Sequence, residues 1–127
     1  MASWDVKGKF AIVTGAGSGM SFSRVHAGCR QLILLYAIGI NHAFAEQLLN
    51  AGCSVIFADI ALRPEAEATI SKFPHPAKDG KPSAVFHRMD QSDWSQIAAT
   101  WDFALQTFGR VDLLCPGAGI WCVFRSL

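Results

Sequence analysis

The sequence has no excess of charge of either sign and no long apolar segment. Charged residues make up 17% of its 127 residues, and the formal net charge is +1. This balance gives no indication of nucleic acid or an anionic membrane surface as a partner. The longest unbroken apolar run, residues 32 to 38, is far below the roughly 20 residues that a membrane-spanning helix needs. We therefore expect no transmembrane segment, and a start without an apolar signal core favours a cytoplasmic location.

The sequence also lacks the patterns of several common catalytic and metal sites. No two of its four cysteines stand at metal-ligand spacing, and its four histidines are scattered, so no metal site is predicted. The Lys-Ser/Thr of a P-loop does not follow Gly19, and the segment GSGMS is not the Gly-x-Ser-x-Gly turn of serine hydrolases. Neither a P-loop nor a serine nucleophile is indicated.

Short apolar runs alternate with amphipathic patterns along the chain. The four apolar runs, which suit strands buried on both faces, are residues 10–13, 55–58, 84–89 and 111–115. The three amphipathic patterns between them, which suit helices, are residues 40–51, 64–73 and 94–108. This order predicts an α/β fold, a partial doubly wound (Rossmann) parallel sheet with about four strands and three helices. Residues 1–127 would form one incomplete domain of this kind.

The third predicted helix carries one apolar stripe at helical spacing. The residues of this stripe are Trp94, Ile97, Ala98, Trp101, Leu105 and Phe108. Its tryptophans suit a core or an interface better than a platform for stacked bases.

Glycine or acidic residues stand at the carboxyl end of each predicted strand. They are Gly15, Asp59, Asp90 and the pair Pro116-Gly117. In doubly wound sheets, ligands bind beyond the carboxyl ends of the strands, so we predict that these residues share one site. Taken singly, each aspartate is better explained as a turn residue at a strand end.

The segment Thr14–Gly19 is a glycine-rich run directly after the first strand. A dinucleotide-binding fingerprint requires a helix that opens at its last glycine and an acidic residue about 20 positions later. Asp59 is 40 residues after Gly19 but 20 residues after Gly39. The spacing therefore indicates that Ile38-Gly39 closes the motif, and that the 18 residues 20–37 are an insertion.

With residues 20–37 left out, VTGAGSG joins IGINHAFAEQLL, and the result resembles the short-chain dehydrogenase/reductase family. The family signature is Thr-Gly, three residues, Gly, one residue, Gly, and the resemblance covers residues 7–19 and 38 to about 120. It implies an oxidoreductase that uses NAD(P) on an alcohol or carbonyl substrate. It also implies a set of residues along the cofactor pyrophosphate, at a helix N-terminus. These are Gly15, Ser18, Gly19, Ile38 and Gly39.

The resemblance implies roles for residues after the other strands as well. Asp59 would bind the ribose diol of NAD and repel the 2′-phosphate of NADP, although Arg63 leaves NADP possible. Asp90-Gln91 would lie near the adenine ring. The segment CPGAGI resembles the family's Asn-Asn-Ala-Gly and would line the cofactor. Pro116-Gly117 replace the two asparagines, whereas Ala118-Gly119 match.

Two explanations of the insertion stay open. Residues 20–37 are either translated noncoding sequence, such as a retained intron, or a genuine loop, and residues 121–127 form a similarly atypical tail. A loop between Gly19 and Gly39 would emerge beside the pyrophosphate, so we expect impaired cofactor binding in either case.

The family's catalytic Tyr-x-x-x-Lys pair is absent from the sequence. The only tyrosine is Tyr36, and position 40 is isoleucine, so we assign no catalytic residue. We expect the cofactor-binding half of such an enzyme, truncated before the catalytic half and inactive by itself. The alternative is a noncatalytic dinucleotide-binding or protein-interaction module, whose unpaired fourth strand would join a partner chain, as in a homo-oligomer.

Overall fold

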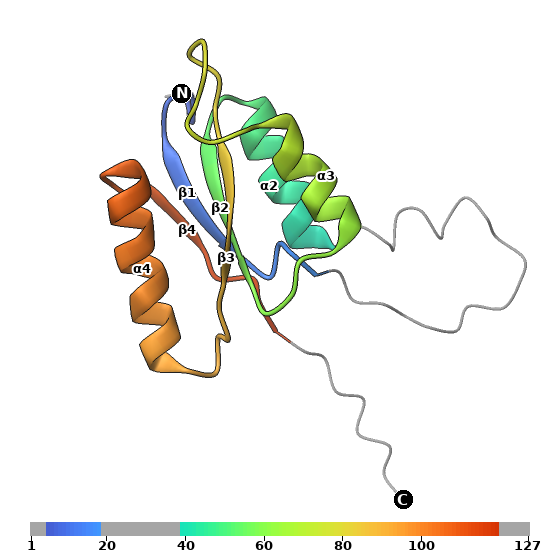
Figure 1. Ribbon diagram of the computed structural model, residues 1–127, viewed down its shortest axis with the longest axis vertical. Coiled ribbons are helices and arrows are strands. Elements are labelled where there is room, and N and C mark those ends of the chain that lie inside the picture. The colour runs from blue at the N-terminus through green and yellow to red at the C-terminus, as the bar shows by residue number, and fades with distance from the viewer. Residues whose placement is uncertain (1–4, 19–38, 120–127) are drawn as a thin grey trace, which may run out of the picture.

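Four parallel strands form the centre of the structure, in the order β3-β2-β1-β4 (Figure 1). This computed structural model describes residues 5–18 and 39–119. Its strands are β1 (Phe10–Thr14), β2 (Ser54–Asp59), β3 (Ala84–Arg88) and β4 (Leu113–Cys115). The chain places β2 and β3 on one side of β1 and then crosses to place β4 on the other side. The carboxyl end of β1 is therefore the switch point at which doubly wound sheets bind ligands.

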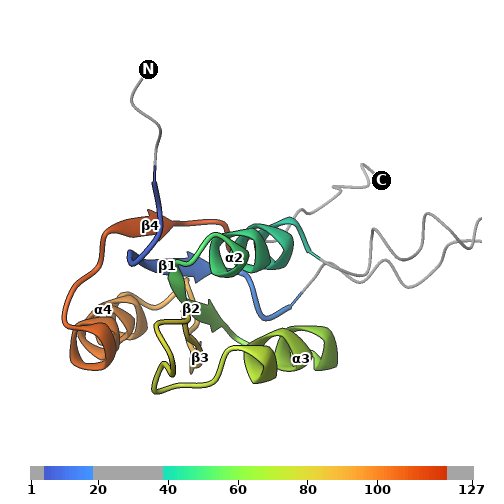
Figure 2. The ribbon, with the colours of Figure 1, turned by 90° about the horizontal axis from the view of Figure 1, so that it is seen from above.

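Three helices in the described part of the chain cover both faces of this sheet. They are α2 (Ile40–Asn50), α3 (Pro64–Lys72) and α4 (Trp94–Phe108). Helices α2 and α3 lie on one face and α4 lies on the other (Figure 2). The predicted doubly wound arrangement is confirmed. None of these helices is long and apolar enough to cross a membrane.

The apolar runs form strands because both sides of the sheet are covered. All six residues of β2 are buried. Val55 and Phe57 belong to the core under α2 and α3, whereas Ile56 and Ala58 belong to the core under α4. A strand with a helix layer on each face has no side that favours polar residues, which explains its continuous apolar sequence.

The helix boundaries follow the signals in the sequence. Helix α3 begins at Pro64, which suits a first helical position because no N–H is needed there. Helix α4 begins after Asp93, whose carboxylate accepts a hydrogen bond from Ser95 N–H at 2.9 Å. It ends at Gly109, which has a φ of 81° and so adopts the left-handed conformation that glycine tolerates best. Strand β4 is shorter than predicted and begins at Leu113.

The predicted apolar stripe of α4 is wrong in part. Ile97 and Phe108 do pack toward the sheet, but Trp94 and Trp101 are 83% and 43% exposed. The buried residues of α4 are Thr100 and Ala104. A small side chain lets the helix approach the strands closely. The threonine can be buried because its hydroxyl donates to the Gln96 carbonyl oxygen at 2.8 Å.

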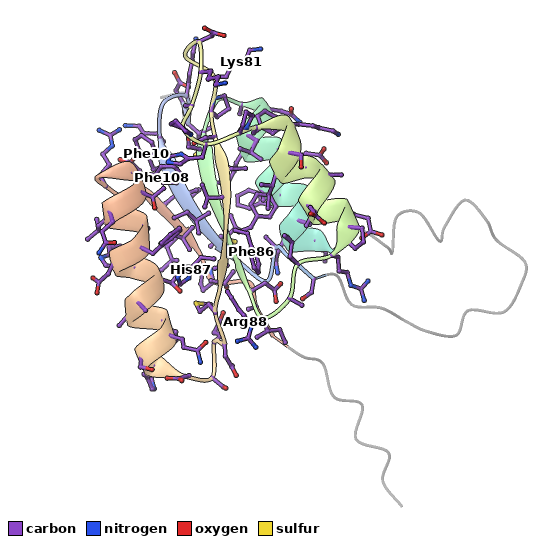
Figure 3. All side chains as sticks on the ribbon, in the orientation of Figure 1. Phe10, Lys81, Phe86, His87, Arg88 and Phe108 are labelled. Atoms are coloured by element: carbon purple, nitrogen blue, oxygen red, sulfur yellow. The ribbon has the colours of Figure 1, made fainter. Side chains whose placement is uncertain are left out.

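Two histidines form hydrogen bonds between neighbouring secondary-structure elements, one on each face of the sheet. His42 Nε2 lies 2.9 Å from Thr69 Oγ1 and so joins α2 to α3. His87 belongs to β3, and its side chain points toward α4 (Figure 3), with its Nδ1 3.1 Å from Thr100 Oγ1. Each threonine hydroxyl donates to a carbonyl oxygen of its own helix, so each histidine nitrogen acts as the donor. Burial lowers the pKa of both imidazoles.

The lowered pKa of His42 predicts a loss of stability in mild acid. The unfolded chain takes up a proton near the ordinary pKa of 6.5, whereas the folded chain resists it. The free energy of unfolding should therefore fall as pH drops below about 6.5, until the lowered folded pKa is passed. In His42→Leu this decline between pH 7.5 and 5 should be shallower in urea unfolding experiments. An unchanged slope in that variant would contradict this account.

Candidate functional site

The glycine-rich turn after β1 closes around the carboxylate of Asp59 at the end of β2. Asp59 Oδ2 accepts hydrogen bonds from Gly17 N–H at 3.0 Å and Ser18 N–H at 2.8 Å. The Ser18 hydroxyl lies 2.9 Å from both carboxylate oxygens, and Ile60 N–H donates to Oδ1 at 2.7 Å. Asp59 is 5% exposed. A buried carboxylate needs such donors to replace water, so Asp59 fixes the shape of the turn.

Glycine is required at position 17 because the turn passes against the segment after β2. A β-carbon on Gly17 would overlap the Ala61 carbonyl oxygen and lie 3.0 Å from Asp59 Cβ. The Gly17 carbonyl oxygen also accepts a hydrogen bond from Arg63 N–H at 2.8 Å. The close approach therefore ties the glycine-rich turn to both ends of the loop between β2 and α3.

The loop after β4 meets the same turn from the other side. Thr14 Oγ1 accepts a hydrogen bond from Ala118 N–H at 3.0 Å, and Asn41 Nδ2 donates to the Gly117 carbonyl oxygen at 2.6 Å. Gly15 has a φ of 74°, and a β-carbon there would lie 2.9 Å from both Ala118 Cα and Asn41 Nδ2. Three segments therefore converge at the carboxyl end of β1: the glycine-rich turn, the first turn of α2, and the loop after β4.

The structure brings most of the predicted cofactor residues to this place. The glycine-rich turn itself contains Gly15 and Ser18. Asp59 lies on the β2 side of this turn, and Gly117-Ala118 lie on its β4 side. Gly119 follows in the same loop and is exposed. Gly39 is the N-cap residue of α2, where its carbonyl oxygen accepts from Ala43 N–H at 3.0 Å. The predicted residues Gly19 and Ile38 lie outside the described residues.

Asp90 and Gln91 follow β3 at the same edge of the sheet and are exposed. The Asp90 carboxylate accepts hydrogen bonds from the Ser92 hydroxyl at 2.6 Å and the Ser92 N–H at 2.9 Å. These two bonds hold the pKa of Asp90 below its usual range. Asp90 N–H donates to Gln96 Oε1 at 2.9 Å. Within the described residues, the side chain of Asp90 therefore orders its own loop and makes no hydrogen bond with the glycine-rich turn.

Three residues of the site were not among those predicted from the sequence: Thr14, Gly17 and Asn41. Thr14 and Gly17 belong to the glycine-rich run itself, so the motif contained the signal. Asn41 had no such signal, because its partner Gly117 is 76 positions away.

The arrangement suits the binding of an anionic ligand. No side chain caps the N-terminus of α2, and its first turn contains no acidic residue. Backbone N–H groups at a helix N-terminus bind phosphate well, particularly beside a glycine turn that allows close approach. Among residues 5–18 and 39–119, no three histidine, cysteine, aspartate or glutamate side chains are grouped to hold a metal ion.

Comparison with protein families agrees with this geometry. A model described as short chain dehydrogenase matches residues 32–126. The chain belongs to the short-chain dehydrogenase family. Among curated members, human 15-hydroxyprostaglandin dehydrogenase [NAD(+)] is 31% identical over 117 residues, which are 91% of this chain and 35% of that protein. Arabidopsis thaliana (+)-neomenthol dehydrogenase is 29% identical over 112 residues, which are 88% of this chain and 31% of that protein.

Solved structures of short-chain dehydrogenases share the fold. A Burkholderia phymatum short chain dehydrogenase/reductase in complex with NAD has a TM-score of 0.58 and 28% identity, covering 87% of this chain and 31% of that one. Escherichia coli hydroxysteroid dehydrogenase has a TM-score of 0.57 and 26% identity, covering 86% and 34%. The chain spans about a third of the length of the curated relatives it matches.

The close approach at Gly17 predicts an unequal effect of two glycine substitutions. Gly17→Ala should lower the free energy of unfolding by about 2–3 kcal/mol, because its β-carbon would force the turn away from Ala61 and Asp59. Gly119→Ala is the matched control, since no described residue comes within 4 Å of a β-carbon there. It should change the free energy of unfolding by less than about 0.5 kcal/mol. Urea unfolding measures both, and equal effects would show that the contact at Gly17 is unimportant.

Proposed function

We propose that this chain is the NAD-binding part of an oxidoreductase that acts on an alcohol or carbonyl substrate. The observation that carries the proposal is the buried Asp59 carboxylate, held at the end of β2 by the glycine-rich turn. The family supports it, as do a relative whose name includes NAD(+) and a similar structure in complex with NAD. A carboxylate at this place favours NAD, because it repels the 2′-phosphate of NADP.

The hydrogen bonds of Asp59 suggest how it would accept a ribose diol. A carboxylate offers about four lone-pair sites, and three backbone N–H groups and the Ser18 hydroxyl share them here. Only the hydroxyl can turn away without movement of the backbone. We propose that Ser18 gives up its hydrogen bonds with Asp59 when the ribose binds, while the N–H groups keep the carboxylate in place.

The remaining site residues would hold the other parts of the cofactor. The N–H groups at the start of α2 would face the pyrophosphate, together with Gly15 and Gly39. The loop Gly117–Gly119 would line the cofactor, and Asp90-Gln91 would lie near the adenine. NAD supplies the hydride chemistry when it is bound. Since the sequence contains no Tyr-x-x-x-Lys pair, we assign no catalytic residue and propose that these 127 residues bind the cofactor without turning over substrate.

Titration of the purified chain with NADH and NADPH tests the cofactor assignment. We expect NADH to bind more tightly than NADPH. In Asp59→Asn, NADH affinity should fall about tenfold or more, because a charged acceptor of the ribose hydroxyls is lost, and the preference over NADPH should shrink. Asp102→Asn is the matched control, since Asp102 is exposed on α4. Equal affinities for both cofactors, or an unaltered preference in Asp59→Asn, would contradict the assignment.

The inserted residues 20–37 give a separate prediction. The chain without them joins Gly19 directly to Ile38-Gly39, so the complete glycine motif would form without a loop beside the pyrophosphate. We expect this shorter chain to bind NADH more tightly than the full chain does, as measured by the same titration. Equal or weaker binding would indicate that residues 20–37 are a genuine part of the site.

A protein-interaction module is the second candidate, favoured by apolar side chains on the outer surface. Trp94 and Trp101 on α4 and Leu114 on β4 are 83%, 43% and 49% exposed. Strand β4 is also an edge of the described sheet, and such edges pair readily with another chain, including a second copy. The NADH titration separates the candidates, because an interaction module has no need of Asp59.

A further inference from the structure

Asn41 and Gly117 are far apart in the sequence but are joined by a hydrogen bond in the site. The segment Pro116–Gly119 resembles the family segment Asn-Asn-Ala-Gly. At position 117 the family segment has its second asparagine, whereas this chain has glycine. We infer that Asn41 takes over the place of that missing amide. Asn41 is then a positioning residue, which holds the loop after β4 against the glycine-rich turn. We call this replacement the exchange: residue 41 carries the amide, and residue 117 is the glycine that leaves room for it.

Steric contact carries the first part of this inference. A β-carbon on Gly117 would overlap Asn41 Oδ1 and lie 2.5 Å from Cγ and 2.6 Å from Nδ2. All three atoms form the planar end of the Asn41 side chain, so the overlap is relieved only if that side chain leaves its present rotamer and gives up its hydrogen bond to the Gly117 carbonyl oxygen. The amide of Asn41 therefore fills the space into which any side chain at position 117 would project. Only glycine fits at 117 while Asn41 is in place.

Hydrogen bonds carry the second part. Asn41 Nδ2 donates to the Gly117 carbonyl oxygen at 2.6 Å, and Thr14 Oγ1 accepts from Ala118 N–H at 3.0 Å. Two successive residues of the loop are thus held by side chains from two other segments. Since Nδ2 also lies 2.9 Å from the place of a Gly15 β-carbon, Asn41 stands where all three segments of the site meet.

The exchange changes which element sets the position of the loop. An asparagine at 117 would carry its amide on the loop itself, whereas Asn41 carries it on the first turn of α2. Helix α2 is anchored by Ala45, Leu48 and Leu49 in the core. The loop after β4 is therefore held by a buried helix. The effect of this on cofactor affinity rests on the proposed function, but the exchange itself does not.

A double-mutant cycle on the full chain tests the exchange. The variants are Gly117→Asn, Asn41→Ala and the two combined, each measured by urea unfolding and by NADH titration. Gly117→Asn alone should lower the urea midpoint and weaken NADH binding about tenfold or more, because the two side chains collide. In the Asn41→Ala background the same change should have less than about a third of that effect on affinity. Gly80→Asn is the matched control, since Gly80 lies in the loop between α3 and β3, outside the proposed site. No described residue comes within 4 Å of a β-carbon there, and asparagine tolerates its φ of 69°.

An isosteric variant separates hydrogen bonding from packing. Asn41→Asp keeps the shape of the side chain but places a carboxylate against the Gly117 carbonyl oxygen. Its urea midpoint relative to the native chain should be lowest near pH 7 and should recover as pH falls toward 4, where the protonated carboxyl again donates a hydrogen bond. A residue that only fills space would show no such recovery.

The outcomes separate this inference from the proposed function. If Gly117→Asn lowers the midpoint equally in both backgrounds, the exchange is overturned, whatever the chain binds. If the cycle is coupled but no form binds NADH, the exchange stands and the proposed function fails. If Gly117→Asn gives no folded protein, recovery of folded protein in the combined variant supports the exchange, and failure of both overturns it.

Discussion

The set of hydrogen bonds around the Asp59 carboxylate is the interaction on which the site depends. A carboxylate that is 5% exposed is stable in that position only when donors replace its water. Gly17 and Ser18 supply N–H groups, and they reach it only because position 17 has no β-carbon. The aspartate therefore orders the turn, and the turn keeps the aspartate buried. The residue proposed to recognise the ribose is the same one that shapes the glycine-rich turn.

Much of this fold and part of the site follow from the sequence by one rule. Parallel strands bring their carboxyl ends to one edge, so the glycine run, Asp59 and the loop after β4 were predicted to lie together. Hydrogen bonds join the glycine run to Asp59 and to the loop after β4. Asp90 was predicted to lie at the same edge, and it does. Because the strand order β3-β2-β1-β4 puts β2 between β3 and β1, Asp90 makes no hydrogen bond to the turn among the described residues. The order of strands along the sequence does not tell which strands are adjacent in the sheet.

Other features depend on distances that no local pattern contains. Hydropathy places Trp101 inside and Thr100 outside, but the buried residues of α4 are Thr100 and Ala104, and Trp101 is 43% exposed. The pairing of Asn41 with Gly117 joins residues 76 positions apart, and each is unremarkable in its own segment. Glycine stands at position 117 where the family segment has asparagine, and the amide at this place comes from Asn41 on α2. Such compensation is visible only when both segments are placed in space.

The placement of α2 also explains why its first turn lies beside the glycine-rich turn, although the two are separated in the sequence. Helix α2 is fixed by the burial of Ala45, Leu48 and Leu49 against β1 and β2, and this contact requires no particular connection to the preceding strand. Once the helix is docked, its first turn brings Asn41 beside Gly15. Hydrophobic burial is non-directional and tolerates loops of varied length. The sheet and its core therefore determine the geometry of the glycine site, while the polar contacts of Asp59 and Asn41 adjust it from either side.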